Sequence, residues 1–278
     1  MCAILKLMKV NGILMKENFN KKFKTDNNKR DNNEKFDDII VGRNCVKEAL
    51  NSGRPIESLL IAKGNKGGAT GVLVSIAKEK GIPIKEVDIK KLDMLCGGAV
   101  HQGVIAMASV KDYSTIDDIF AEAEKRGEPP FILVLDEIED PHNLGAIIRT
   151  AECTGVHGII IPKRRSAGLG YTVGKSSAGA VEYVNVARVT NIPNVIDELK
   201  ERGVWVFGAD MNGEDSSKID FTGAVALVIG NEGKGIGKLV KSKCDGIVSL
   251  PMKGRINSLN ASVAAGVLMY DVLKQRNK

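Results

Sequence analysis

The sequence predicts an α/β protein in which a mainly parallel sheet follows a smaller α/β domain. Two apolar runs, residues 131–136 and 224–229, lack the alternation of polar and apolar residues that a half-exposed strand shows. Both runs are therefore predicted to be strands that are buried on both faces. Segments with helical periodicity separate the predicted strands. With 278 residues, the chain is long enough for two domains that each bury a core.

The smaller domain is predicted at residues 37–110, where short strands alternate with helices. Its first segment, residues 37–50, is typical of a short strand that enters a helix. The other predicted elements are strands at 59–62, 84–87 and 104–108 and helices at 72–80 and 90–95. Residues 111–129 are predicted to be a linker with one amphipathic helical piece, Ile116–Lys125.

The larger domain is predicted at residues 130–278. Its predicted strands lie at 131–136, 158–162, 181–189, 204–209, 224–229 and 246–251. Helices are predicted at 143–154, at 194–202 and from about Asn257 onwards, and a Gly- and Ser-rich loop follows Pro162. Apolar strands separated by helices favour a mainly parallel sheet that is covered on both faces.

The positive charge of the chain is concentrated at its beginning. Residues 1–35 contain nine Lys/Arg and four Asp/Glu, whereas the other 31 basic and 30 acidic residues nearly cancel. The segment 1–36 is rich in Asn and Lys and cannot bury a core, so it is predicted to be a disordered basic tail. It is either an electrostatic tether for a polyanion or a solubilising extension, and Met15 is an alternative start of the chain.

Cysteine and histidine usage excludes several classes of protein. The five cysteines lie far apart without a C-x-x-C pair, which predicts reduced thiols in a cytoplasmic protein. With three scattered histidines, no metal site is expected. No apolar run approaches the roughly 20 residues of a membrane span, and the first residues are too interrupted by lysine for a signal peptide.

Three unusual segments follow predicted strands, where open α/β sheets bind their ligands. The first, residues 136–149, places Asn143 as a candidate helix cap and Gly145 where another backbone can approach. Arg149 lies further along the same predicted helix. A buried arginine needs an anionic partner, so the sequence leaves open a structural ion pair and a bound phosphate.

The second segment is the glycine-rich turn Gly-Asn-Glu-Gly-Lys-Gly at 230–235. It matches neither the phosphate-binding loop G-x-x-x-x-G-K-[ST] nor the dinucleotide fingerprint G-x-G-x-x-G, which disfavours a nucleotide-dependent dehydrogenase. Glu232 in the middle of the turn would repel phosphates, so a neutral or cationic ligand fits better, with a plain surface carboxylate as the alternative.

The third segment, residues 250–265, contains Ser258 and Asn260 at the start of an alanine-rich helix. Taken alone, these two residues are typical helix caps. The small residues of the helix allow close packing against another element or another subunit.

Together the three segments resemble the sequence motifs of the SpoU (TrmH-like) family of RNA 2′-O-ribose methyltransferases, within the SPOUT superfamily. Asp-Pro-His-Asn-Leu-Gly at 140–145 with Arg149 resembles the first motif. The strand and turn at 227–236 resemble the second motif, and residues 250–264 resemble the third. Residues 41–50 and 101–104 resemble the substrate-binding domain of the family, and the resemblance extends over about residues 37–276.

The resemblance implies a catalytic domain with a deep trefoil knot, S-adenosylmethionine as the cofactor, and a homodimer whose site is completed across the interface. It implies cofactor contacts from Ile229, Gly230, Leu250, Met252 and Leu259. It assigns Arg149 to the activation of the ribose 2′-OH. Because arginine is a poor base, we expect Arg149 to fix a substrate phosphate and stabilise developing charge. Asn143, Glu232, Ser258 and Asn260 are then expected to orient Arg149 and the ribose.

The domain order favours ribosomal RNA as the substrate, with a guanosine of the 23S species as the expected target. Contacts with RNA are expected from Arg43 and Asn44 on the smaller domain, and from Arg165 and Lys175 on the larger domain. A tRNA guanosine 2′-O-methyltransferase and a non-catalytic RNA-binding relative are the alternatives. The few aromatic residues provide no stacking platform, so charge, shape and ribose contacts are expected to recognise the RNA.

Overall fold

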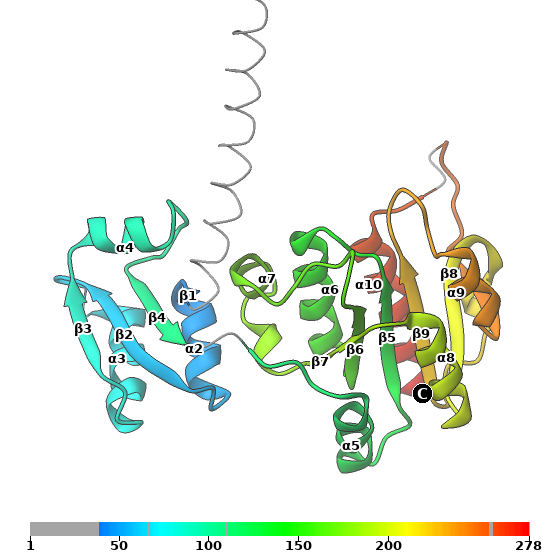
Figure 1. Ribbon diagram of the computed structural model, residues 1–278, viewed down its shortest axis with the longest axis horizontal. Coiled ribbons are helices and arrows are strands. Elements are labelled where there is room, and N and C mark those ends of the chain that lie inside the picture. Colours follow the sequence, from blue (N-terminus) through cyan, green and yellow to red (C-terminus); the bar gives the residue numbers. More distant parts are fainter. Residues whose placement is uncertain (1–38, 66, 109–110, 256–257, 278) are drawn as a thin grey trace, which may run out of the picture.

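The computed structural model describes residues 39–65, 67–108, 111–255 and 258–277, which form two sheets with their own helices (Figure 1). The predicted basic tail lies outside these residues. The smaller sheet has the order β1-β4-β2-β3. Its strands are β1 (Ile39–Val41), β2 (Ile56–Ala62), β3 (Ile84–Val87) and β4 (Val104–Ala108).

Three helices cover the smaller sheet: α2 (Arg43–Asn51), α3 (Gly68–Glu79) and α4 (Ile89–Leu95). Val46 and Leu50 of α2 and Leu73 of α3 are buried together against one set of strand residues. Leu92 of α4 is buried in a second cluster with Ile39 and other strand residues. The domain therefore has an apolar core of its own, as its length and composition predict.

The larger sheet has six strands in the order β10-β8-β9-β5-β6-β7, and every pair in it is parallel. This confirms the predicted mainly parallel sheet. The strands are β5 (Phe131–Asp136), β6 (Gly158–Pro162), β7 (Asn185–Val189), β8 (Trp205–Asp215), β9 (Val225–Gly230) and β10 (Gly246–Ser249).

Helices cover both faces of this sheet. On one face, α6 (Pro141–Cys153), α7 (Tyr171–Ser176) and α10 (Ala261–Arg276) contribute to the core around Leu133 and Leu135. On the other face, α5 (Ile116–Arg126), α8 (Ile192–Glu201) and α9 (Lys238–Lys243) contribute to the core around Ile132 and Val134. The alternating side chains of the fully buried β5 thus serve two separate cores.

Several predicted boundaries were wrong. The strand predicted at 181–189 begins at Asn185, because Ala180–Glu182 form a 3-10 turn. The final helix begins at Ala261, where Asn260 caps it, and not at Asn257. The helix α7 lies in the Gly- and Ser-rich segment that we predicted to be a loop, and α9 lies in a segment for which we predicted no element. Both are only six residues long, and so short a segment has little helical periodicity to recognise.

The end of the chain returns across the sheet. The strand β10 lies at one edge of the sheet, and the helix that follows it in the sequence, α10, packs against α6 and β9. Asn260 of the third motif thereby lies beside the turn that follows β9, where its amide donates to Glu232. The trefoil knot that the resemblance implies stays a prediction.

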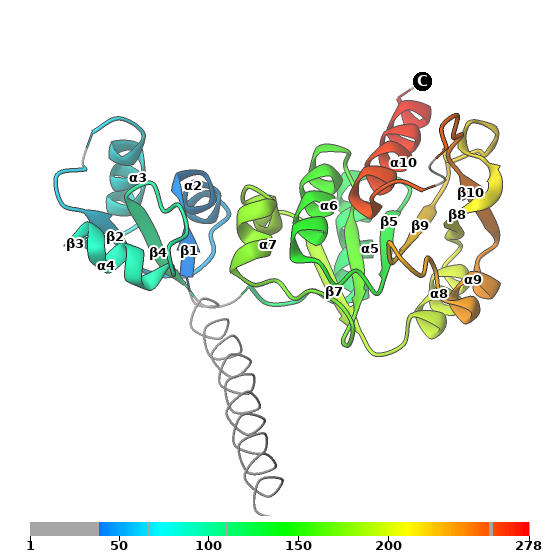
Figure 2. The same ribbon diagram turned by 90° about the horizontal axis from the view of Figure 1, so that it is seen from above.

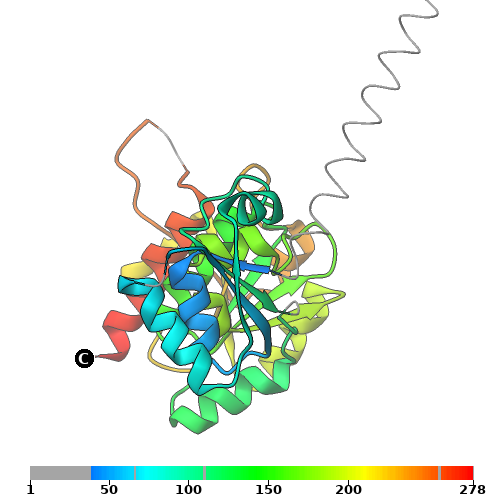
Figure 3. The ribbon, with the colours of Figure 1, turned by 90° about the vertical axis from the view of Figure 1, so that its left-hand side faces the viewer.

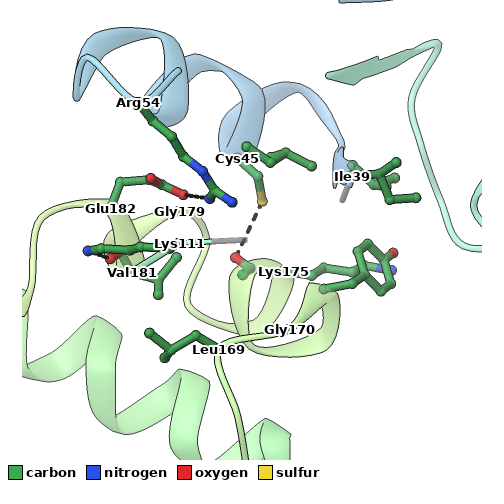
Figure 4. Close-up of a pocket in the computed structure, with 14 residues that line it drawn as sticks. Ile39, Cys45, Arg54, Lys111, Leu169, Gly170, Lys175, Gly179, Val181 and Glu182 are labelled. Carbon is green, nitrogen blue, oxygen red and sulfur yellow. Dashed lines mark hydrogen bonds and ion pairs between the residues drawn. The ribbon is translucent and has the colours of Figure 1, made fainter. Parts of the chain in front are cut away.

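The two domains meet at α7 and the 3-10 turn Ala180–Glu182, which face β1 and α2 (Figure 2). Figure 3 shows the molecule with the smaller domain in front of the larger one. Figure 4 shows the side chains at this junction. The Arg54 guanidinium and the Glu182 carboxylate form an ion pair of 2.6 Å between the domains, and their side chains are only 14% and 4% exposed. Lys111 donates hydrogen bonds to the carbonyls of Val181 and Val184, and burial lowers the pKa of Lys111 to about 8.

Breaking the buried ion pair at the junction is expected to destabilise the protein. Arg54→Ala leaves the Glu182 carboxylate buried without its charged partner, which typically costs about 3–5 kcal/mol. Urea unfolding measures the loss. Lys63→Ala, which removes an exposed pair with Asp88, is the matched control and should cost at most about 1 kcal/mol. Equal unfolding midpoints for the two variants would contradict a buried junction.

Other features of the described residues bear on the class of protein. The four cysteines in the described ranges are free thiols. Among these residues, no helix combines the length and the apolar character that a membrane crossing requires. They also hold no group of three or more His, Cys, Asp or Glu side chains that could bind a metal ion.

Candidate active site

The carboxyl ends of β5 and β9 place the first two motifs side by side. Asp136 and Gly230, the last residues of these parallel strands, are register partners. The turns that follow both strands therefore begin at the same edge of the sheet, where α/β proteins bind ligands.

Polar contacts hold the turn after β9 in one conformation. Asn231 and Gly235 exchange backbone hydrogen bonds of 3.1 and 2.7 Å. The Asn231 side chain accepts from the backbone N–H of Gly233 at 2.9 Å and donates to the Glu137 carbonyl at 3.0 Å. The buried Asp136 carboxylate, whose pKa is raised by burial, accepts from the N–H of Gly237 at 2.8 Å. The turn is therefore anchored to β5 at both of its ends.

Gly230 is required at the start of this turn. A Cβ atom at this position would lie 2.5 Å from the backbone oxygen of Gly235 and would also collide with the backbone of Ile236. Real Cβ atoms do not approach backbone so closely, so only glycine allows the turn to fold back onto the end of β9.

Side chains from the three motifs meet in one hydrogen-bonded cluster. The Asn260 amide donates to the Glu232 carboxylate at 2.7 Å and to the Asn143 side-chain oxygen at 3.0 Å. The Asn143 amide also donates to Glu232. The Asn260 oxygen accepts from the backbone N–H groups of Ser262 and Val263, which fixes its amide toward Glu232. Residues that are 117 positions apart thus orient a single carboxylate.

The first motif positions Asn143 differently from our prediction. Asp140, not Asn143, caps α6, because the Asp140 carboxylate accepts from the N–H of His142 at 2.8 Å. Asn143 lies in the first turn of the helix, and its side chain is free to reach the cluster. The predicted close approach at Gly145 is confirmed, since a Cβ there would lie 2.7 Å from the Cβ of Ser176 and 3.0 Å from the backbone nitrogen of Ser177 on the α7 side.

A cleft of about 720 Å³ opens beside this cluster. Its walls come from the ends of β8, β9 and β10 and from the start of α10. All five residues that were predicted to contact the cofactor line it together with Glu232 and Ser258: Ile229, Gly230, Leu250, Met252 and Leu259.

The lining of the cleft fits S-adenosylmethionine. Its volume lies in the usual range for small-molecule sites, which is about 300–1,000 Å³. Apolar side chains such as Ile229 and Leu268 suit an adenine ring, while the carboxylate of Glu232 suits a cationic ligand. Gly230 also lines the cleft and has no side chain to cover its backbone, which allows recognition through main-chain groups.

Sequence reasoning missed one wall of this cleft. Asp210, Met211 and Asn212 line it from the carboxyl-terminal part of β8. Asp210 pairs with Lys241 at 2.8 Å, and this contact lowers the pKa of the Asp210 carboxyl. The rule that ligands bind at the carboxyl ends of strands applies equally to β8, so the position of these residues was a usable signal.

Arg149 lies apart from the cluster. Its side chain is exposed on α6, and no hydrogen bond or ion pair joins it to another of the described residues. Of the two alternatives that the sequence left open for Arg149, the structural ion pair is not formed among the described residues, and the bound phosphate stays a prediction. The step of six positions from Asn143 to Arg149 rotates the side chain about 240° around the helix axis, which turns it away from Asn143.

The expected RNA contacts fall into two groups. Arg43 and Asn44 start α2, and the neighbouring Cys45 thiol contacts the carbonyl of Gly174 at 3.5 Å, next to the exposed Lys175. These three candidates thus lie near the junction of the domains. Arg165 lies elsewhere, where its guanidinium binds Glu137 at 2.7 Å on the turn after β5.

Comparison with known proteins agrees with this architecture. The profile of the SpoU rRNA Methylase family matches residues 130–270, and the profile for RNA 2′-O ribose methyltransferase substrate binding matches residues 39–114. A putative TrmH family tRNA/rRNA methyltransferase of Bacillus subtilis is 50% identical over 241 residues, which cover 86% of this chain and 96% of the relative.

Two solved structures add to the comparison. The SpoU methyltransferase AviRb of Streptomyces viridochromogenes, in complex with AdoMet, is 25% identical, with a TM-score of 0.73 over 86% of this chain and 90% of that chain. A TrmH/SpoU tRNA modifying enzyme of A. aeolicus is 27% identical, with a TM-score of 0.50, and covers 54% of this chain and 77% of its own. With both domains matched and a relative at 50% identity, this chain belongs to the SpoU (TrmH-like) family and is an S-adenosylmethionine-dependent RNA 2′-O-ribose methyltransferase with a substrate-binding domain.

Proposed function

We propose that this enzyme methylates ribosomal RNA at the 2′-oxygen of a guanosine in the 23S species, and that it acts as a homodimer. The presence of the substrate-binding domain supports ribosomal RNA, because the tRNA modifying enzyme of A. aeolicus aligns with only 54% of this chain. We assign residues 37–110 to RNA binding, 111–129 to a linker and 130–278 to catalysis. The free thiols fit a cytoplasmic protein.

The observation that carries the catalytic proposal is the carboxylate of Glu232, held by the amides of Asn143 and Asn260 at the cofactor cleft. S-Adenosylmethionine supplies an electrophilic methyl group. Glu232 accepts both amide hydrogen bonds on one oxygen, so its other oxygen remains an acceptor for the ribose hydroxyl. Ser258, which lines the same cleft, adds a second hydroxyl-binding group. This arrangement orients the nucleophile without requiring a strong base.

In this proposal, Arg149 serves the cleft of the partner subunit. Its side chain points away from its own cluster and has no partner among the described residues. The methyl of Thr150, the residue after Arg149, lies 3.8 Å from the position that a Cβ on Gly266 would take, so α6 packs closely on α10 next to Arg149. A guanidinium there can bind a substrate phosphate through two parallel hydrogen bonds and stabilise negative charge on the attacking oxygen.

An apolar stripe supports the dimer. Val263, Val267 and Tyr270 follow a helical spacing on α10 and are 51%, 43% and 45% exposed. Residues spaced in this way lie on one face of a helix. A second copy of the chain that covers this stripe through a two-fold axis would bring each Arg149 next to the other subunit.

The two alternatives differ in their predictions. A tRNA guanosine methyltransferase would use the same cleft and cluster, so only the substrate distinguishes it. A non-catalytic RNA-binding relative does not need the complete cluster of Asn143, Glu232 and Asn260. In this structure the three side chains are hydrogen-bonded to one another, and Glu232 lines the cleft. This arrangement favours an active enzyme.

Labelling with radioactive S-adenosylmethionine tests the substrate. The purified protein is incubated with unmodified 23S ribosomal RNA and, separately, with bulk tRNA, and both are digested to nucleosides. We expect 2′-O-methylguanosine from the ribosomal RNA alone. Label in tRNA alone would replace the ribosomal assignment with the tRNA alternative. Absence of label in both, with measurable cofactor binding, would contradict activity on either naked RNA.

A further inference from the structure

The substrate-binding domain has a cleft of its own, which no part of the methyl-transfer site uses. It has a volume of about 680 Å³ and lies between the turn after β2, the start of α4 and the turn before β4. The residues that line it include Lys63, Asn65, Ile89, Val100 and Gln102. The cleft contains the His-Gln-Gly sequence at 101–103, to which the catalytic site assigns no role.

Buried contacts give this cleft a defined shape. The ring of His101, which is 7% exposed, contacts the Asp93 carboxylate at 3.0 Å through Nε2 and accepts from the N–H of Gly103 through Nδ1 at 2.9 Å. The Asn65 amide donates to the Gln102 carbonyl at 3.4 Å. Gly103 has a φ of +83°, and a Cβ there would collide with the Asn65 side chain. The two turns are thus packed against each other.

Backbone conformation sets Gln102 apart from its neighbours. It adopts a φ of 53°, which is unfavourable for a residue other than glycine. Strained residues of this kind persist where the surroundings hold them, and they occur preferentially at binding sites. The side-chain oxygen of Gln102 accepts from the backbone N–H of Arg43 at 3.2 Å, so this strained turn also positions the start of α2.

The mouth of the cleft combines apolar and hydrogen-bonding groups. Ile89 is 58% exposed and Val100 is 68% exposed, and no other described residue covers them. The amide groups of Asn65 and Gln102 lie in the same lining. Exposed apolar side chains next to amides suit a flat ring with polar edges, such as a nucleobase that is not paired.

Charge around the cleft favours an anionic partner. Lys63, Lys90 and Lys91 are exposed on the elements that form it, and Arg43 is held at its edge by Gln102. The two nearby acidic groups have cationic or hydrogen-bonding partners, since Asp88 pairs with Lys63 and Asp93 contacts His101. The phosphates of an RNA strand can therefore approach without facing an unpaired carboxylate.

The cleft is also continuous with the expected RNA contacts of the other domain. Arg43 links Gln102 to α2, and Cys45 in the same turn of α2 contacts α7, which carries Lys175. A single RNA strand can therefore extend from this cleft, past the domain junction, toward the methyl-transfer site.

We propose that this cleft binds one unpaired nucleotide of the RNA substrate. Its base packs on Ile89 and Val100, its edge meets Asn65 and Gln102, and its phosphates lie near Lys63 and Arg43. The inference rests on the proposed action on RNA and adds a second recognition point to it. The enzyme then selects an RNA whose target ribose and unpaired nucleotide lie at a fixed separation.

A pair of matched variants tests this site. Val100→Glu places a carboxylate at the mouth of the cleft, whereas Val72→Glu makes the same change on α3, at a valine that is 53% exposed and does not line the cleft. Filter binding of 23S ribosomal RNA and of tRNA is measured for both variants at one salt concentration. We expect Val100→Glu to weaken RNA binding at least about tenfold, the scale of losing one stacked base. Val72→Glu should change it less than about twofold, and both variants should keep wild-type affinity for S-adenosylmethionine.

Ultraviolet crosslinking of the wild-type complex locates the nucleotide. Crosslinks from residues 89–103 to an unpaired nucleotide support the proposal, whereas crosslinks only to paired nucleotides overturn it. Equal RNA binding by the Val100→Glu and Val72→Glu variants also overturns the proposal. It would do so even if Val100→Glu weakened the binding of a protein partner, because the cleft would then not bind RNA. The wild-type enzyme could instead bind and methylate tRNA, with weaker tRNA binding by Val100→Glu. That result would support the nucleotide-binding cleft and contradict the assignment of ribosomal RNA as the substrate.

Discussion

Replacing Arg149 with alanine is expected to reduce methyl transfer by about 10²- to 10³-fold, the usual effect of removing one group that stabilises transition-state charge. The affinity for S-adenosylmethionine should not change, because Arg149 does not line its own cofactor cleft. Arg149→Lys should lose most of the activity as well, since an ammonium cannot form the two parallel hydrogen bonds of a guanidinium. Single-turnover rates with saturating RNA and calorimetric cofactor binding measure the two effects separately.

Mixing subunits tests whether Arg149 acts on the partner. In a heterodimer of Arg149→Ala and Glu232→Ala subunits, one of the two sites combines an intact arginine with an intact carboxylate. Random mixing of two inactive variants should then restore about a quarter of the wild-type sites. A mixture that is no more active than its components would show that both residues act within one subunit. Full activity of Arg149→Lys would refute the phosphate-binding role.

Replacing Gly230 with alanine is expected to abolish cofactor binding at concentrations that saturate the wild-type enzyme. The added Cβ would collide with backbone atoms of Gly235 and Ile236, which cannot move away as a side chain can. The turn after β9 must then shift, and this displaces Glu232 and one wall of the cleft. Overpacking of this kind also lowers the free energy of unfolding by about 1–3 kcal/mol. Calorimetric titration with S-adenosylmethionine and urea unfolding measure both changes.

Gly233→Ala is the control for this prediction. Gly233 belongs to the same turn, but a Cβ there would meet only the Asn231 side-chain oxygen, at the ordinary contact distance of 3.5 Å. This variant should therefore bind the cofactor within about threefold of the wild type, a difference below 1 kcal/mol. Normal binding by Gly230→Ala would mean that the turn opens without cost and does not shape the cleft.

Local patterns in the sequence were sufficient for the fold class and for most elements. The apolar runs at 131–136 and 224–229 predicted buried parallel strands, and both strands lie in the centre of the six-stranded sheet. The alternation of short strands with helices identified the smaller domain, and three linked motifs identified the cofactor cleft. All five cofactor residues that the family resemblance implied line that cleft, which lies at the strand ends where α/β sheets bind their ligands.

Contacts between distant segments were decided only by the tertiary structure. Asn143 seemed to be a cap, yet it binds Glu232 and Asn260, which the chain brings together only when the third motif returns across the sheet. For Arg149 the sequence left open a structural ion pair and a bound phosphate, and only the structure shows that the side chain is exposed on α6 and forms no ion pair with the described residues. The junction of Arg54 with Glu182 joins residues 128 positions apart. A sequence pattern shows how apolar residues repeat along one helix or strand and where that element begins and ends. Which elements face each other depends on packing over the whole chain, and a local pattern does not contain that information.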